Sequence, residues 1–127
     1  MIDKFKRLVA IRLTGGNGSD YRNGEELMGE VWKFHPQTLA ADKGYDGNSL
    51  RATLKRKHVE CCIPPLRHRR DKYTYDADKY KLRKGIEHYF GHLKEFRAIA
   101  TRYNKTAAAY LSFVYIAATL EYLKTIC

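Results

Sequence analysis

One stretch of the chain carries an acid, two cations and a phenol at spacings that place them on the same side of a helix. At about 100° per residue, an arc of roughly 60° holds Tyr80, Arg83, Glu87 and Lys94. Such a stripe could serve an active site, or it could be an i, i+4 ladder of salt bridges, worth only about 0.2–0.5 kcal/mol per pair. Gly91 beside the stripe permits a close approach, which favours a ligand-facing surface. Periodicity alone leaves both interpretations open.

A second acid, Asp42, ends the short apolar run Thr38–Asp42 (TLAAD), which is typical of a buried strand. Sites in open α/β sheets gather at the carboxyl ends of strands, so this rule points to Asp42. A carboxylate at a strand tip, one on a helix and a third nearby form the hard-oxygen ligand set that Mg²⁺ or Mn²⁺ prefers. Two such ions about 3.5–4 Å apart can activate the attacking oxygen and stabilise the leaving oxygen in phosphoryl transfer.

The elements that must position these acids alternate between strands and helices. Turn residues and β-rich or apolar runs predict the strands Leu8–Leu13, Thr38–Asp42 and Val59–Ile63. Periodicity and capping signals predict helices from Asn23 to about Phe34, over Asn48–His58, from Asp78 to about Phe96 and over Lys105–Lys124. The apolar face of the third helix, which includes Leu82, Tyr89 and Leu93, is expected to pack on the sheet. This order predicts an α/β fold, with a small mixed sheet flanked by helices.

The charge of the 127-residue chain is concentrated in its second half. The net charge is +10; residues 1–50 hold seven basic and seven acidic side chains, and residues 51–127 hold seventeen and seven. This asymmetry favours a nucleic-acid face over an acidic partner, although solubility alone would also explain it. The loop Leu66–Tyr75 interleaves basic and aromatic residues, which suits phosphates and bases. Its candidates are Arg67, Arg69, Arg70, Lys72, Tyr73 and Tyr75.

Other patterns exclude a membrane anchor and a disulfide framework. The longest uncharged run, Thr106–Leu120, has fifteen residues, short of the ~20 needed to span a bilayer. Three cysteines, an odd number without framework spacing, predict a reduced, cytosolic setting. His88 and His92 are four residues apart and could ligate a metal, but no Glu stands between them as a metalloprotease helix would require.

Several motifs occur in the order found in one group of enzymes. The segment 39–46 (LAADKGYD) resembles the "ADKGYD" segment around the second acid of bacterial insertion-sequence DDE transposases. The spacing Tyr80-x2-Arg83-x3-Glu87-x6-Lys94 is similar to the Tyr-Arg-Glu-Lys signature of the same group. The flanks agree as well, in residues 63–65 (IPP), 90–94 (FGHLK) and 97–103 (RAIATRY). The resemblance runs from about Asp3 to Leu123.

This resemblance implies an RNase H-like fold and three acids that bind two Mg²⁺ or Mn²⁺ ions. The implied activity is phosphodiester hydrolysis at the ends of an element, followed by joining of the freed 3′-hydroxyl to target DNA. Asp42 resembles the second acid and Glu87 the third, while Tyr80, Arg83 and Lys94 resemble residues that hold the DNA backbone. The implied partners are element ends and target DNA, with a homo-oligomer formed on the DNA. The implied location is the bacterial cytoplasm, at the nucleoid.

Asp3 resembles the first acid of the group, which completes the catalytic and metal-binding set Asp3, Asp42 and Glu87. It stands eleven residues before Thr14, as in relatives. However, Lys6-Arg7-Leu8 stands where relatives have a turn, and only Met1 and Ile2 precede Asp3. We therefore expect residues 1–127 to form a single, partial catalytic domain, N-terminally truncated with extra C-terminal helices. Such a chain would be weakly active or inactive alone.

Three functions remain open from the sequence. The chain is a DDE transposase, a noncatalytic remnant that binds DNA, or a small basic nucleic-acid-binding domain. Only the first predicts Mg²⁺-dependent strand chemistry that is lost in Asp42→Asn or Glu87→Gln. Two further carboxylates are expected to be structural: Asp46 to cap the helix after it rather than bind metal, and Asp20 to serve a turn or a helix cap.

Overall fold

The computed structural model describes residues 1–15, 20–101 and 106–127. The chain divides into two compact units. One, here called the sheet unit, is Thr14–Arg83, and the other, here called the helix unit, is Met1–Leu13 together with Lys84–Cys127. The predicted turn at residues 16–18 and the side chain of Asp20 lie outside the described part.

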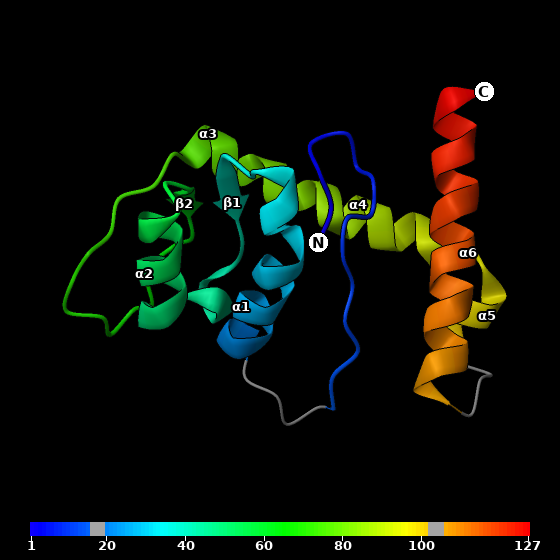
Figure 1. Cartoon of the computed structure of the whole chain (residues 1–127), viewed down its shortest axis with the longest axis horizontal. Coiled ribbons are helices and arrows are strands. Elements are labelled where there is room, and N and C mark those ends of the chain that lie inside the picture. The colour runs from blue at the N-terminus through cyan, green and yellow to red at the C-terminus, as the bar shows by residue number, and fades with distance from the viewer. Residues whose placement is uncertain (16–19, 102–105) are drawn as a thin grey trace. The chain divides into compact units, whose positions relative to one another are not determined.

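The sheet unit is built around a parallel β-α-β arrangement (Figure 1). Strand β1 (Thr38–Ala40) pairs with β2 (Glu60–Cys62) in the register Thr38↔Glu60 to Ala40↔Cys62, and helix α2 (Asn48–Arg56) connects them. These elements confirm the two predicted strands and the helix between them. Within the described residues, the sheet has these two parallel strands and is not mixed. The fold is therefore mixed α/β with a small sheet, as expected in outline.

Helix α1 (Asp20–Val31) packs against α2 and covers the same unit (Figure 1). It starts before the predicted cap Asn23, and a 3-10 turn, η1 (Trp32–Phe34), extends it to the point at which Pro36 ends helical structure. Leu50 and Leu54 lie one turn apart on α2 and are fully buried, which fixes the face that α2 presents to the interior. The other buried apolar side chains among the described residues of the unit are Met28, Val31, Val59, Cys62 and Ile63.

The connection to the helix unit is not the single helix that the sequence predicts. Helix α3 (Ala77–Tyr80) is followed by the 3-10 segment η3 (Lys81–Arg83) and then by α4 (Lys84–Leu93). Asp76 caps α3 by accepting from the backbone N–H groups of Asp78 and Lys79. Three-residue 3-10 winding changes the rotation per residue, so the stripe predicted at 100° per residue does not continue through η3.

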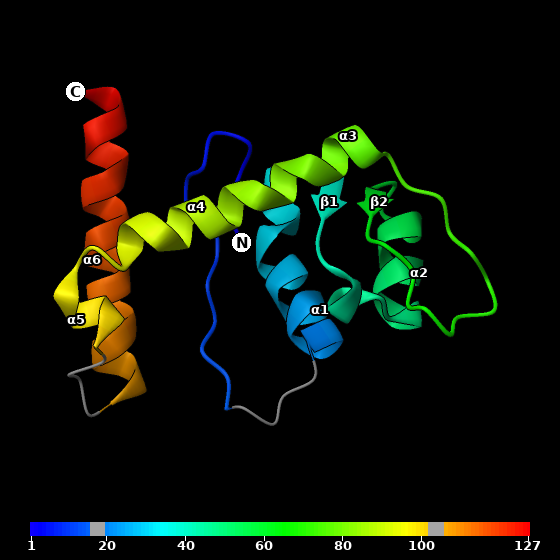
Figure 2. The same ribbon diagram turned by 180° about the vertical axis from the view of Figure 1, so that it is seen from behind.

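In the helix unit, α4 lies across α6 (Ala107–Ile126), with the short α5 (Arg97–Ala100) beside α6 (Figures 1 and 2). The buried cluster consists of Tyr89, Leu93, Ile99, Val114 and Ala117. The apolar face of α4 therefore packs with α5 and α6, whereas the sequence predicted that it packs on the sheet. Leu82, expected on that face, is 61% exposed.

The prediction of a first strand over Leu8–Leu13 is wrong. Residues 8–13 are all described, and their only β-type pairing is an isolated antiparallel bridge between Ile2 and Leu8. The protonated N-terminus of Met1 donates to the carbonyl of Ala10 at 2.6 Å, which closes a short loop. A β-rich sequence forms a strand only when another strand accepts its backbone hydrogen bonds, and here a single bridge takes that place.

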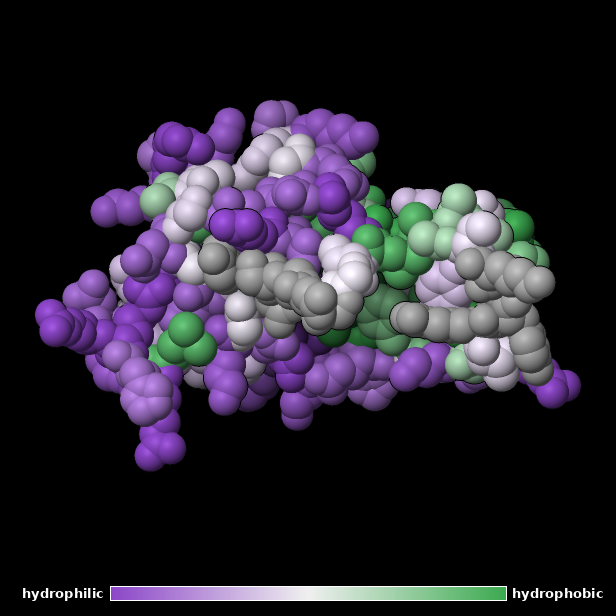
Figure 3. Space-filling view, turned by 90° about the horizontal axis from the view of Figure 1, so that it is seen from below, coloured by the Kyte–Doolittle hydropathy of each residue, from purple (hydrophilic) through white to green (hydrophobic). Residues whose placement is uncertain are grey.

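Helix α6 has apolar side chains on several sides. Val114 and Ala117 are buried, whereas the solvent-facing apolar side chains include Phe113, Ile116, Leu120 and Leu123. Figure 3 shows hydrophobic residues in green over this helix. No helix in the described part of the chain is long and apolar enough to span a membrane.

Two glycines of α1 give a matched test of how tightly this helix packs near Asp42. A Cβ on Gly24 would lie 2.7 Å from Tyr45 Cδ1, whereas a Cβ on Gly29 would meet nothing within 4 Å. We expect Gly24→Ala to destabilise the chain by about 1–3 kcal/mol through overpacking. Gly29→Ala is expected to stabilise it by about 0.5–1 kcal/mol, because alanine favours the helix. Urea unfolding measures both, and equal effects of the two substitutions would contradict the predicted contact.

Candidate functional site

Asp42 lies just past the carboxyl end of β1, close to its predicted place. The N–H of Ala41 still bonds to the carbonyl of Cys62, at 3.4 Å, and Asp42 then starts the 3-10 turn η2 (Lys43–Tyr45). Its Oδ1 accepts the backbone N–H of Gly44 at 2.9 Å. The residue is half-buried. The turn thus holds the carboxyl group in one orientation at the edge of the sheet.

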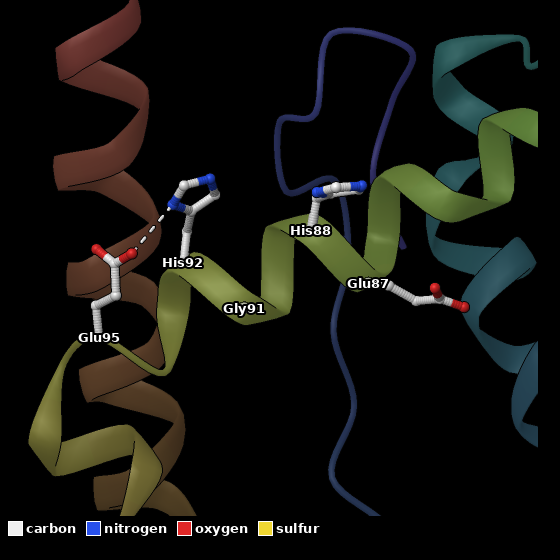
Figure 4. Close-up of a pocket in the computed structure, with 5 residues that line it drawn as sticks. All are labelled: Glu87, His88, Gly91, His92 and Glu95. Atoms are coloured by element: carbon white, nitrogen blue, oxygen red, sulfur yellow. Dashed lines mark ion pairs between the residues drawn. The ribbon is translucent and has the colours of Figure 1, made fainter.

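Glu87 is exposed in the first turn of α4. It lines a shallow depression along one side of the helix together with His88, Gly91, His92 and Glu95 (Figure 4). In this view the Glu87 side chain points away from the two histidines, and His92 Nδ1 pairs with Glu95 Oε1 at 3.4 Å. A Cβ on Gly91 would meet nothing within 4 Å. The depression is therefore open to a ligand on the side where Gly91 was predicted to permit approach.

Asp3 is bound by its own neighbours. Its Oδ1 accepts the backbone N–H groups of Phe5 and Arg7, each at 2.9 Å, and its Oδ2 accepts Arg7 Nε at 2.6 Å. Partial burial opposes the charge, but these hydrogen bonds outweigh it and hold the pKa of Asp3 below its ordinary value. Both carboxylate oxygens are thus engaged within the loop, a poor arrangement for a metal ligand.

The three predicted acids are distributed over both units. Asp42 belongs to the sheet unit, and Asp3 and Glu87 belong to the helix unit. Across the described residues, no three His, Cys, Asp or Glu side chains form a group that could hold a metal ion. The carboxylates of Asp42 and Glu87 are of the type that suits Mg²⁺ or Mn²⁺. Asp3 does not fit that role while Arg7 holds it.

The predicted DNA-backbone residues occupy the α3–η3–α4 segment. Tyr80, the last residue of α3, packs edge-on against Tyr75 with ring centroids 5.4 Å apart. The guanidinium of Arg83 lies 5.8 Å from the centre of the Tyr80 ring. Lys94 follows α4 and is exposed. The structure therefore brings Tyr80 and Arg83 together in the sheet unit.

Asp46 was expected to cap α2, and this prediction is wrong. The N-cap of α2 is Gly47, which has no side-chain cap bond. The Asp46 side chain has no exposed surface; its Oδ1 accepts Arg51 Nε at 2.5 Å, and its Oδ2 accepts Arg69 Nε at 2.8 Å and the backbone N–H of Leu66 at 2.6 Å. An aspartate two positions before a helix resembles a helix cap in the sequence. One of the actual partners of Asp46, Arg69, is 23 residues away.

The contacts of Asp46 lower its pKa. Burial opposes the charge, but the hydrogen bonds from Leu66, Arg51 and Arg69 outweigh it and hold the pKa of Asp46 below its ordinary value. The Arg51 and Arg69 side chains are only 9% and 13% exposed. Arg69, a predicted DNA contact, is therefore directed into the fold, whereas Arg67 and Arg70 of the same loop are exposed.

Comparison with known proteins identifies relatives of the chain. A family model described as "Transposase DDE domain" matches residues 1–121. A curated protein of Brucella ovis named "Putative transposase for insertion sequence element IS6501" is 34% identical in an alignment that covers 98% of this chain and 95% of the relative. No solved structure matches. The matched range includes Asp3, Asp42 and Glu87.

Proposed function

Because the chain belongs to the transposase DDE domain family, we propose that it acts on DNA as the transposase of an insertion sequence. The proposed reaction is metal-dependent hydrolysis of the phosphodiester at element ends, followed by strand transfer to target DNA. The observation that supports it is the family match over residues 1–121, within which Asp42 follows β1 and Glu87 is exposed on α4. The parallel β1-α2-β2 arrangement is compatible with an RNase H-like catalytic domain.

We assign the catalytic acids to Asp42 and Glu87. Their carboxylates would hold Mg²⁺ or Mn²⁺, which supplies positive charge to the reacting phosphate when bound. Asp3, which resembles the first acid of the group, would complete the set only after its release from Arg7. We therefore propose that the chain alone has weak strand-transfer activity. Tyr80, Arg83 and Lys94, with Arg67 and Arg70 of the basic loop, would hold the DNA backbone through charge-assisted bonds.

The same proposal covers partners and location. DNA at the element ends and at the target would be the substrate, and the net charge of +10 favours this polyanion. We propose a homo-oligomer on paired ends and a location in the bacterial cytoplasm, at the nucleoid.

A second candidate function is a DNA-binding protein without catalysis. The observation that favours it is the engagement of both Asp3 oxygens by Phe5 and Arg7. Both candidates predict DNA affinity that falls with salt. They differ in metal dependence, so the deciding assay is strand transfer. A duplex that carries a pre-cut element end is mixed with supercoiled plasmid, with Mg²⁺ or Mn²⁺ or with EDTA, and relaxed or linear plasmid joined to the duplex is measured.

Releasing Asp3 is expected to raise activity in that assay. Arg7→Gln removes the partner of the Asp3 carboxylate, and we expect strand transfer to rise about threefold to fivefold, since an exposed ion pair is weak. Lys4→Gln is the matched control, because it removes the same charge from the same loop without a bond to Asp3. A rate unchanged or lowered in Arg7→Gln would assign the Asp3–Arg7 pair a structural role only.

A further inference from the structure

The basic loop that runs from β2 to α3 (Figure 1) is fixed to the sheet unit at several points. At its start, the N–H of Leu66 donates to Asp46 Oδ2 at 2.6 Å. In its middle, Arg69 donates to Asp46 Oδ2 at 2.8 Å and to Asn48 Oδ1 at 2.5 Å. At its end, Tyr75 packs on Tyr80. A loop with this much positive charge would otherwise repel itself and sample many conformations.

Tyr73 extends the attachment through its ring. The guanidinium of Arg51 lies 4.2 Å from the ring centre and that of Arg69 lies 5.2 Å from it. Arg51 also donates to the carbonyl of Ile63, at 2.8 Å, directly after β2. Asp46, Arg51, Arg69 and Tyr73, here called the anchor cluster, thus connect α2, the end of β2 and the loop.

The remaining basic residues of the loop face the solvent. Arg67, Arg70 and Lys72 are exposed, and Lys72 Nζ donates to the carbonyl of Arg67 at 3.1 Å. Arg69 is thus directed inward, while Arg67, Arg70 and Lys72 carry three positive charges on the exposed side within six residues, with the exposed acid Asp71 between them. In the anchor cluster one carboxylate faces two guanidinium groups, so the charge of Asp46 is compensated inside the fold and does not oppose an external anion.

We propose that Asp46 is a positioning residue for DNA binding, which holds the loop so that Arg67, Arg70 and Lys72 contact backbone phosphates of duplex DNA. The identity of the polyanion rests on the proposed function; the anchoring rests on the contacts above. A loop fixed before binding does not lose that conformational freedom on binding, which strengthens affinity without a new contact. An acidic residue thereby supports the binding of an acidic polymer.

The proposal predicts a change in DNA affinity that is opposite to the change expected from charge alone. Removing a negative charge ordinarily strengthens DNA binding, yet Asp46→Asn is expected to weaken it about tenfold. Asp71→Asn is the matched control: Asp71 is an exposed acid of the same loop, and its loss should leave affinity unchanged or raise it. Arg67→Gln combined with Arg70→Gln should weaken binding and reduce the slope of log K against log salt by about two.

The measurement is fluorescence anisotropy with a labelled duplex of about 20 base pairs at several salt concentrations. EDTA is present throughout, so failure of strand transfer and failure of this proposal are separate results. Far-UV circular dichroism checks that each variant is folded. If Asp46→Asn is unfolded, Tyr73→Leu decides, because it removes the ring from Arg51 and Arg69 without a change of charge and should weaken binding about threefold to tenfold. The proposal would be overturned if the deciding variant, Asp46→Asn or else Tyr73→Leu, binds DNA as tightly as the parent chain. It would also be overturned if Arg67→Gln combined with Arg70→Gln leaves the DNA affinity unchanged.

Discussion

Asp42→Asn and Glu87→Gln are each expected to lower strand transfer by about 100-fold to 1,000-fold, because a catalytic metal site contributes several kcal/mol and each 1.36 kcal/mol is tenfold. Both substitutions keep the shape of the side chain and remove its charge. In Asp42→Asn the new amide oxygen can still accept the N–H of Gly44, and Glu87 is exposed, so the fold should persist in both variants. The assay is the metal-dependent joining of a pre-cut duplex to plasmid.

Two further variants test whether the loss of strand transfer is specific to Asp42 and Glu87. Glu95→Gln changes another carboxylate of the same depression, and its activity should stay within about threefold of the parent, as for a surface substitution. The double variant of Asp42 and Glu87 should be no slower than either single variant, since residues that act as one unit lose their effect together. DNA affinity in EDTA should be retained in all four proteins. Full activity in either single variant would refute the assignment.

Asp46→Ala is expected to have the largest effect on stability, about 3–5 kcal/mol. The substitution leaves Arg51 and Arg69 buried without their carboxylate, and breaking a buried ion pair from one side costs about this much. Asp71→Ala, in the exposed part of the loop, should change stability by less than about 0.5 kcal/mol. Urea unfolding at neutral pH measures both, and a small effect of Asp46→Ala would mean that the cluster opens readily.

The same carboxylate gives a pH dependence with a definite sign. The pKa of Asp46 is lowered in the fold, so its contribution to stability is complete above the ordinary value of 3.8 and disappears as pH falls through the folded-state pKa. The free energy of unfolding should therefore fall between about pH 5 and about pH 2. Asp3 and Glu60, whose pKa values are also lowered, contribute in the same direction. The Asp46→Ala variant should show a smaller fall, which separates its share from theirs.

Much of the sheet unit could be predicted from sequence because its signals are local. Leu50 and Leu54 repeat at helical spacing, apolar runs precede Asp42 and Pro64, and Pro36 ends the first helix. The position of Asp42 past β1 follows from these elements. Glu87 and its neighbours were predicted from motif spacing, and the structure places Glu87 in the first turn of α4.

The remaining features depend on partners that are distant in the sequence. Leu8–Leu13 has the composition of a strand, but in the described structure only Ile2 bridges to it. The helix predicted from Asp78 breaks at η3. Just before the break, Lys79 of α3 pairs with Glu60 of β2 at 2.5 Å, and just after it Gly85 of α4 weakens helical propensity. The role of Asp46 depends on Arg69, which no local pattern connects to it.

The apolar surface of α6 has a consequence for the colloidal behaviour of the chain. At low ionic strength, about 0.01 M, charges act over about 30 Å, and the net charge of +10 keeps molecules apart. At about 1 M salt this range shrinks to about 3 Å, while contacts between exposed Phe113, Ile116 and Leu120 are not weakened. High salt is also the condition that strips nucleic acid from a basic protein. The chain should therefore be least soluble in the buffers that free it from DNA.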